Sequence, residues 1–211
     1  MSIQIAFYFD QSRCMSCNAC TVACKDWHQL NPGLVNWREQ FTYEVPPNGF
    51  FPLALGCNHC EEPACVAACP SGAIVKDEEG VVIIHRELCQ SYLSCISACP
   101  FAKPKVADDK QEPNPYIGWQ VNHPAQKCTA CRDRLSKGDK PACVKACIGR
   151  ALDFGEINDI QAKYPTAVRL NPAEFPYAYK NNQTETLPSV FIKKRDALVV
   201  HKSTVYTGIP V

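Results

Sequence analysis

The sequence of 211 residues lacks the features that mark membrane insertion, export and nucleic-acid binding. No apolar run approaches the roughly 20 residues that a membrane-spanning helix needs. The amino-terminal segment has no basic region, no long apolar core and no twin-arginine pair, so we expect no signal peptide. The sequence has 22 basic and 21 acidic residues and no block of basic residues, so we expect no nucleic-acid partner and no direct membrane insertion.

Catalytic and nucleotide-binding patterns are also missing. There is no glycine-rich phosphate motif, and the five histidines are scattered at His28, His59, His85, His123 and His201. We therefore predict no catalytic residues. His59 lies between two cysteines, and we expect it to pack or hydrogen-bond beside a metal site rather than to ligate the metal.

Cysteine, by contrast, is abundant, with 15 residues in four runs. The runs are Cys14, Cys17, Cys20 and Cys24; Cys57, Cys60, Cys65 and Cys69; Cys89, Cys95 and Cys99; and Cys128, Cys131, Cys143 and Cys147. Such closely spaced cysteines rarely form structural disulfides, whereas thiolates suit zinc or iron–sulfur clusters. Seventeen prolines and ten glycines predict a loop-rich chain, in which bound metal would supply part of the folding free energy.

An internal repeat and a few short patterns predict the local structure. PACVAACPSGAI (63–74) matches PACVKACIGRAL (141–152) around the last two cysteines of the second and fourth runs, which indicates duplication. Each run is expected to end in a short helix. Strands are expected at 3–9, 81–84, 151–155, 187–194 and 197–201, with a turn at 10–13 and the rest of 148–211 extended.

Four complete runs would hold sixteen cysteines, and the single vacancy falls at Tyr92. Zinc is an alternative metal, because C-x2-C pairs are common in structural zinc sites. The C-x2-C-x2-C spacing of the first run and the endings Cys69-Pro70 and Cys99-Pro100 resemble bacterial two-cluster ferredoxins instead. In those proteins each run gives three thiolates to one cluster and its last cysteine to the other. We therefore favour iron–sulfur clusters.

The ferredoxin resemblance implies four sites, which we name A to D. Site A comprises Cys14, Cys17, Cys20 and Cys147; site B comprises Cys24, Cys128, Cys131 and Cys143; site C comprises Cys57, Cys60, Cys65 and Cys99; and site D comprises Cys69, Cys89 and Cys95. It also implies an α+β fold in which one two-cluster ferredoxin-like unit is nested within another. The outer unit would comprise 1–24 and 100–155 and the inner unit 57–99, with an insertion at 25–56 and an extended, cysteine-free tail at 156–211 for partner docking.

Tyr92 leaves the cluster type of site D open. Loss of the corner iron gives a [3Fe–4S] cluster, which we favour. Alternatively, a [4Fe–4S] cluster keeps that iron with water, hydroxide or phenolate as its ligand, although a phenol has a pKa near 10 and binds iron only when deprotonated. Simple packing of Tyr92 in the vacant corner fits either case. The expected cofactors are three [4Fe–4S] clusters and this three-cysteine cluster.

Longer stretches resemble one family over residues 3–155. SRCMSCNACTVACKDW (12–27), GCNHCEEPACVAACPSGAI (56–74) and the KCTACRDRL…KPACVKAC run (127–147) are similar to the iron–sulfur subunits of the dimethyl sulfoxide reductase family of molybdopterin oxidoreductases. The resemblance implies a non-catalytic subunit that relays single electrons between a large molybdenum or tungsten bis-pterin subunit, nearest site A, and a membrane quinone-reactive subunit or other redox partner, nearest site D. Similar nitrate reductase subunits have tryptophan at the Tyr92 position and carry [3Fe–4S].

Two other functions remain as alternatives: a free polyferredoxin that serves a formate dehydrogenase or hydrogenase, and a structural zinc protein. We expect the protein in the cytoplasm, or in the periplasm only as a passenger of an exported catalytic subunit, and at the membrane only through a partner. Basic residues flank several cysteines, and we expect most of their side chains to be solvated. They are Lys103, Lys105, Lys127, Arg132 and Arg134.

Overall fold

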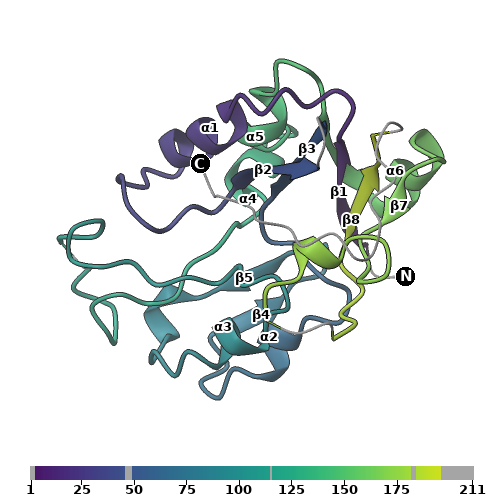
Figure 1. The fold of residues 1–211 in the computed structure, drawn as a ribbon. Coiled ribbons are helices and arrows are strands. Elements are labelled where there is room, and N and C mark those ends of the chain that lie inside the picture. Colours follow the sequence, from purple (N-terminus) through teal and green to yellow (C-terminus); the bar gives the residue numbers. More distant parts are fainter. Residues whose placement is uncertain (1–2, 46–48, 115, 182–183, 196–211) are drawn as a thin grey trace.

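The computed structural model describes residues 3–45, 49–114, 116–181 and 184–195. The strand that we predict at 197–201 lies outside these residues. Within them, one four-stranded sheet, two two-stranded sheets and short helices alternate with long turns and loops (Figure 1). The mixed α and β composition is as predicted, and the nested two-cluster arrangement stays a prediction.

The four-stranded sheet forms around β1 (Ile5–Asp10), where the sequence predicts a strand. Its strand order is β6–β1–β8–β7, with β6 at Leu152–Glu156, β7 at Val168–Arg169 and β8 at Val190–Lys193. β1 pairs antiparallel with β6 and parallel with β8. All of β1 is buried because both faces are covered: Phe7 and Phe9 belong to the main core, and Tyr8 belongs to a smaller cluster behind the sheet.

The cysteine runs end in short helices, as predicted. They are α1 (Ala19–Trp27), α2 (Ala64–Ala67), α3 (Ser94–Ala98) and α5 (Ala142–Lys145), and a further turn of helix, α4, covers Arg132–Leu135. Helix α1 contacts α5, and α2 contacts α3. The first and fourth runs therefore meet in space, as do the second and third, and Figure 1 shows the two pairs in opposite halves of the molecule.

Between α2 and α3 lies the smallest of the hairpins. β4 (Ile74–Lys76) pairs antiparallel with β5 (Val82–Ile84), which confirms the strand predicted at 81–84. The 3-10 turn η1 (Arg86–Leu88) leads from β5 into the third cysteine run. The corresponding pair in the other half is β1 with β6, so each pair of cysteine runs is flanked by an antiparallel pair of strands.

The insertion at 25–56 contains a hairpin that we did not predict. β2 (Glu39–Val45) pairs antiparallel with β3 (Gly49–Leu55). Phe51 and Leu53 point into the main core and are almost fully buried. Alternating apolar residues were the available signal, because residues two apart in a strand lie on one face. The insertion is thus part of the core.

The tail differs from the extended structure that the sequence predicts. Helix α6 (Ile157–Lys163) and the 3-10 turn η2 (Pro176–Ala178) interrupt it, and β8 lies inside the main sheet, which confirms the strand predicted at 187–194. The prediction of extended structure is wrong for α6, because Ile160 packs behind β1 with Tyr8. The described tail therefore packs on its own chain, and its role in docking a partner stays a prediction.

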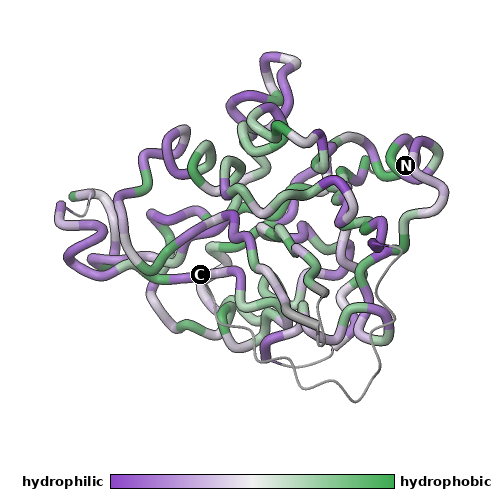
Figure 2. The backbone as a smooth tube through the Cα atoms, turned by 45° about the horizontal axis from the view of Figure 1, so that its top comes forward, coloured by the Kyte–Doolittle hydropathy of each residue, from purple (hydrophilic) through white to green (hydrophobic). Residues whose placement is uncertain are grey.

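Hydrophobic residues are spread through the fold in short stretches, as Figure 2 shows. Among the residues that the structure describes, none of the helices is long and apolar enough to cross a membrane.

Candidate metal centres

All fifteen cysteines lie in the described residues, and all are free thiols. They interact electrostatically in four groups. Cys14 does so with Cys17, Cys20 and Cys147; Cys24 with Cys128, Cys131 and Cys143; Cys65 with Cys57, Cys60 and Cys99; and Cys95 with Cys69 and Cys89. The structure thus brings together the members of sites A, B, C and D, and their role as iron ligands stays a prediction.

The four sites lie in a series. Cys20 of site A is close enough to Cys143 of site B for their charges to interact. Cys57 of site C acts in the same way on Cys128 of site B. The last link joins Cys95 of site D to Cys99 of site C. The order along the molecule is therefore A, B, C, D.

The loop between the first two ligand positions has one backbone feature in common in every run. The residue before the second position has positive φ in all four: Ser16, His59, Ser91 and Ala130, at 57°, 42°, 54° and 54°. This left-handed conformation is uncommon for residues other than glycine. It turns successive N–H groups toward one side, and such concave backbone nests bind anions and line many iron–sulfur sites.

Several of these backbone N–H groups donate to cysteine sulfur. Ser16 donates to Cys14, and Ala130 donates to Cys128 Sγ at 3.4 Å. At the end of the fourth run, Ala151 donates to Cys147 Sγ at 3.2 Å. Hydrogen bonds to the charged form of a thiol favour that form. The loops therefore provide an environment for anionic sulfur.

Side chains also contact sulfur, and three of these contacts involve a hydroxyl group or an imidazole. The hydroxyl of Thr186, from the tail, lies 3.2 Å from Cys60 Sγ, and that of Ser71 lies 3.5 Å from Cys69 Sγ. In site B, His28 Nε2 lies 3.2 Å from Cys131 Sγ. Sequence reasoning missed all three. Thr186 and His28 are distant from their cysteines in the chain, whereas Ser71 follows Cys69 by only two residues.

Burial makes unpaired thiolates costly at these sites. It raises the pKa of Cys14 to about 11 and those of Cys60 and Cys128 to about 12, and neighbouring thiols add to the rise. Three or four such groups become anionic together only if positive charge is bound among them, and a ligated metal holds thiols deprotonated. The donor set therefore fits iron–sulfur clusters. No group of three or more described His, Cys, Asp or Glu side chains is arranged to hold a single metal ion.

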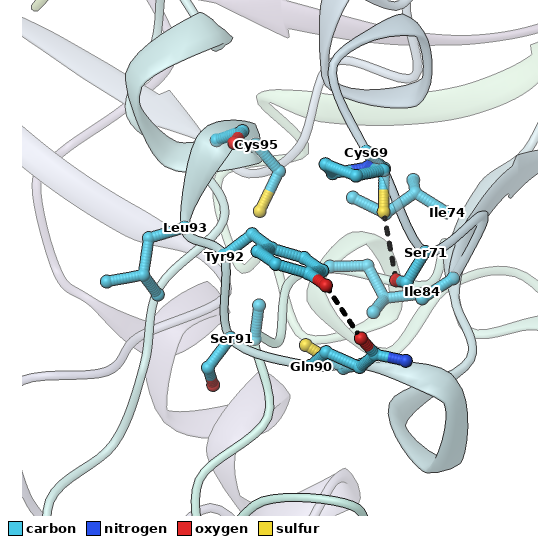
Figure 3. Close-up of a pocket in the computed structure, with 14 residues that line it drawn as sticks. Cys69, Ser71, Ile74, Ile84, Gln90, Ser91, Tyr92, Leu93 and Cys95 are labelled. Carbon is cyan, nitrogen blue, oxygen red and sulfur yellow. Dashed lines mark hydrogen bonds between the residues drawn. The ribbon is translucent and has the colours of Figure 1, made fainter.

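Tyr92 lines a pocket with the three cysteines of site D. Figure 3 shows its ring among Cys69 and Cys95 and its hydroxyl directed at Gln90, whose Oε1 accepts its hydrogen bond at 2.9 Å. The residue is 58 % exposed, so it does not fill a closed corner. Ser91 and Leu93, on either side, have positive φ like Ser16 and Asn18 around Cys17. Tyr92 therefore occupies the backbone position of a second ligand.

His59 is fully buried beside site C. Its Nδ1 accepts a hydrogen bond from Val82 N–H at 3.0 Å, so its proton is on Nε2. Burial, with Lys127 and Arg38 nearby, holds the pKa of His59 well below its usual range. Nε2 has no hydrogen-bond partner among the described residues. A buried N–H without a partner is unfavourable, and cluster sulfur would be a suitable acceptor. Its contact with a cluster stays a prediction.

The structure corrects the expectation that the flanking basic residues are mostly solvated. Lys103 and Lys127 are 7 % and 3 % exposed. Lys103 pairs with Glu39 at 3.0 Å, and Lys127 donates to the backbone carbonyls of Val82 and Cys128. The expectation failed because the exposure of a side chain depends on long-range packing.

The fold and this arrangement of thiols define a ferredoxin-like iron–sulfur protein. The family model for the 4Fe-4S dicluster domain matches residues 49–157. The protein belongs to the iron–sulfur, electron-transfer subunits of the dimethyl sulfoxide reductase family, as the resemblance implied.

Curated relatives cover most of the sequence. The B subunit of the anaerobic dimethyl sulfoxide reductase of Escherichia coli (strain K12) is 35 % identical over 193 residues, which are 86 % of this chain and 88 % of that protein. Perchlorate reductase subunit beta of Dechloromonas aromatica (strain RCB) is 38 % identical over 158 residues, which are 74 % of this chain and 43 % of that protein. The iron-sulfur subunit of the nitrate-inducible formate dehydrogenase of E. coli (strain K12) is 35 % identical over 171 residues, which are 72 % of this chain and 54 % of that protein.

Proposed function

We propose that the protein is a non-catalytic electron-transfer subunit whose four sites form one relay in the order A, B, C, D. The observation that carries the proposal is the unbroken series of thiol groups linked through Cys20 and Cys143, Cys57 and Cys128, and Cys95 and Cys99. When bound, iron–sulfur clusters accept and release single electrons at potentials that charge, hydrogen bonds and solvent exposure set. Burial of most of these cysteines limits solvent access.

The cysteines would hold three [4Fe–4S] clusters at sites A, B and C and a [3Fe–4S] cluster at site D. Two observations support site D as a three-ligand site: the side chain of Tyr92 is exposed, and its hydroxyl donates a hydrogen bond to Gln90. A hydroxyl that donates to an amide oxygen is protonated, and a protonated phenol does not ligate iron. The outer and inner units, 1–24 with 100–155 and 57–99, would each hold two of these clusters.

Partners would dock at the two ends of the series. Exposed apolar side chains lie near the cysteines at both ends. Near site A they are Met15 (59 % exposed) and Ile148 (72 %), and near site D they are Leu88 (50 %) and Leu93 (47 %). Exposed apolar groups at the ends of a relay fit protein interfaces. The partner at site A would be a large molybdenum or tungsten bis-pterin subunit, since relatives are subunits of dimethyl sulfoxide and perchlorate reductases. A membrane quinone-reactive subunit would dock at site D.

Anaerobic purification of the native complex tests this function. We expect a brown protein that contains acid-labile sulfide and iron in the ratio for three [4Fe–4S] clusters and one [3Fe–4S] cluster, together with a large pterin-containing subunit. A stable monomer with the same clusters would favour the free polyferredoxin shuttle. A colourless protein with zinc as its metal would identify a structural zinc protein and overturn the proposal.

A further inference from the structure

Arg38 is a buried cation to which the sequence patterns drew no attention. It directly precedes β2 and is 3 % exposed. The ion pairs among the described residues include none with Arg38. Lys103, which is also buried, has the Glu39 carboxylate beside it. A buried cation without an anionic partner is strongly unfavourable, so the charge of Arg38 requires a compensating group.

The contacts of the guanidinium show which groups surround it. Nη1 donates to the carbonyl of Ala54 at 2.9 Å, and Cζ lies 4.9 Å from the centre of the Phe7 ring. Nη2 lies 3.5 Å from Cys143 Sγ. Nε is buried and has no hydrogen-bond partner among the described residues. One edge is thus held by the hairpin strand β3, while another faces sulfur.

The thiols near Arg38 belong to two different sites. Its charge acts on Cys20 of site A and on Cys128 and Cys143 of site B. Cys20 and Cys143 are also the pair that links the two sites. An arginine side chain is effectively always protonated in proteins, so the guanidinium keeps its charge. Arg38 therefore lies at the junction of sites A and B.

We propose that Arg38 is a positioning residue that acts as a fixed counter-charge shared by sites A and B and stabilises the electron-rich state of each. The inference rests on the proposed iron–sulfur function. An electron that reaches either site adds one negative charge beside the guanidinium, and no bond forms or breaks. No proton is needed either, because arginine is permanently charged. Local positive charge raises the reduction potential of an iron–sulfur site.

The test is redox titration of the anaerobically purified complex, followed by EPR, in wild type and in variants at Arg38. In Arg38→Met, which removes the charge and keeps much of the length, we expect two of the four midpoint potentials to fall and the other two to stay unchanged. Arg38→Lys keeps the charge, so in this variant the same two midpoint potentials should lie between those of wild type and those of Arg38→Met. A purely structural role would not produce this ordering.

Arg86→Met is the matched control. Arg86 is partly buried, and its Nη2 donates to both carboxylate oxygens of Glu112, at 2.7 and 2.9 Å. Its charge is therefore already neutralised, and removing it should leave all four potentials unchanged. If the Arg38→Met protein binds its clusters and keeps the wild-type potentials, the inference is overturned while the electron-transfer function stays intact. Wild-type protein without clusters would instead overturn the function.

A measurement on wild type covers the case in which Arg38→Met does not assemble. In protein labelled with ¹⁵N-arginine, pulsed EPR of the reduced clusters should detect arginine nitrogen coupled to a cluster, because Nη2 lies at contact distance from Cys143 Sγ. Absence of any arginine coupling in the loaded protein would overturn the inference.

Discussion

At the scale of single residues, Tyr92 and Arg38 give two of the thiol groups distinct surroundings: Tyr92 lines the pocket of site D, and Arg38 lies beside Cys143 of site B. Tyr92 stands at the second ligand position of site D, and the left-handed residues around it keep the loop in the same conformation as at Cys17. Tyr92 therefore removes one thiol from the loop while leaving the backbone of the loop intact. Arg38 places a charge between two sites that have complete sets of cysteines.

Tyr92→Cys should restore a four-cysteine site. We expect the EPR signal of an oxidised [3Fe–4S] cluster to disappear and the iron content to rise by about one atom per protein molecule, because a fourth thiolate retains the corner iron. Cys17→Tyr is the matched reverse change and should create a [3Fe–4S] signal at site A. Tyr92→Phe should leave the wild-type signal in place. A [3Fe–4S] signal that appears in that variant and is missing from wild type would instead identify the phenolate as a ligand of the corner iron.

Two hydroxyl groups allow the potentials of sites C and D to be separated. Thr186→Val should lower the potential of site C only, because it removes the hydrogen bond to Cys60 Sγ while keeping the side-chain shape. Ser71→Ala removes the contact with Cys69 and should lower the potential of site D only. Redox titration of both variants checks this pairing. A shift of the same cluster in both would contradict the assignment of Cys60 and Cys69 to different sites.

At the scale of elements, the tail is tied to the cysteine-containing part through Asp153 of β6. Its carboxylate accepts hydrogen bonds from Lys163 at 2.7 Å and Tyr164 at 2.8 Å, at the end of α6, and from Lys140 in the loop before α5. Burial acts to raise the pKa of Asp153, but these donors outweigh it and hold the pKa below its usual range. Tyr164 also stacks on Tyr8 of β1. One carboxylate thus links α6 to the sheet.

Asp153→Asn should lower the free energy of unfolding at pH 7 by about 1–3 kcal/mol, because hydrogen bonds to a charged group are lost. The folded pKa is depressed, so this stabilisation is fully present above the unfolded pKa near 3.9 and is lost only as the pH falls further toward the folded pKa. The difference between wild type and variant should therefore stay constant from pH 8 to pH 5 in denaturant titrations followed by circular dichroism. Lys163→Met removes one donor and should cost less. A difference that shrinks between pH 8 and pH 5 would contradict this account.

At the scale of the whole molecule, the cysteines form part of the core. Cys20, Cys99 and Cys143 belong to the main hydrophobic cluster, and Cys65, Cys89 and Cys95 belong to the second. Both hydrophobic clusters thus contain buried thiols from segments that are far apart in the chain. Metal binding at such sites contributes folding free energy directly.

Removal of iron should therefore unfold much of the molecule. We expect the apo protein, prepared by anaerobic oxidation and chelation, to lose its cooperative thermal transition and to elute earlier from a sizing column. Protein treated with chelator alone, which keeps its clusters, is the control. Retention of the native circular dichroism spectrum and thermal transition after complete iron removal would show that the apolar core suffices.

Local patterns in the sequence allowed the strands at 3–9 and 81–84 and the run-ending helices to be predicted, because apolar alternation and cysteine spacing are local. The hairpin β2–β3 and helix α6 escaped prediction. Their stability comes from contacts with distant segments: Phe51 with the main core and Ile160 with Tyr8. The apolar alternation of β3 is visible in the sequence, but the distant segments against which Phe51 and Ile160 pack are not.

The sequence by itself determined the four runs, the vacancy at Tyr92 and the family, since the number and spacing of thiols are properties of the chain. Only the tertiary structure decided which groups surround those thiols. It placed Arg38 between sites A and B, left Nε2 of His59 without a partner, and brought Thr186 to Cys60. Burial and charge partners arise when segments far apart in the chain fold together, so no local pattern specifies them.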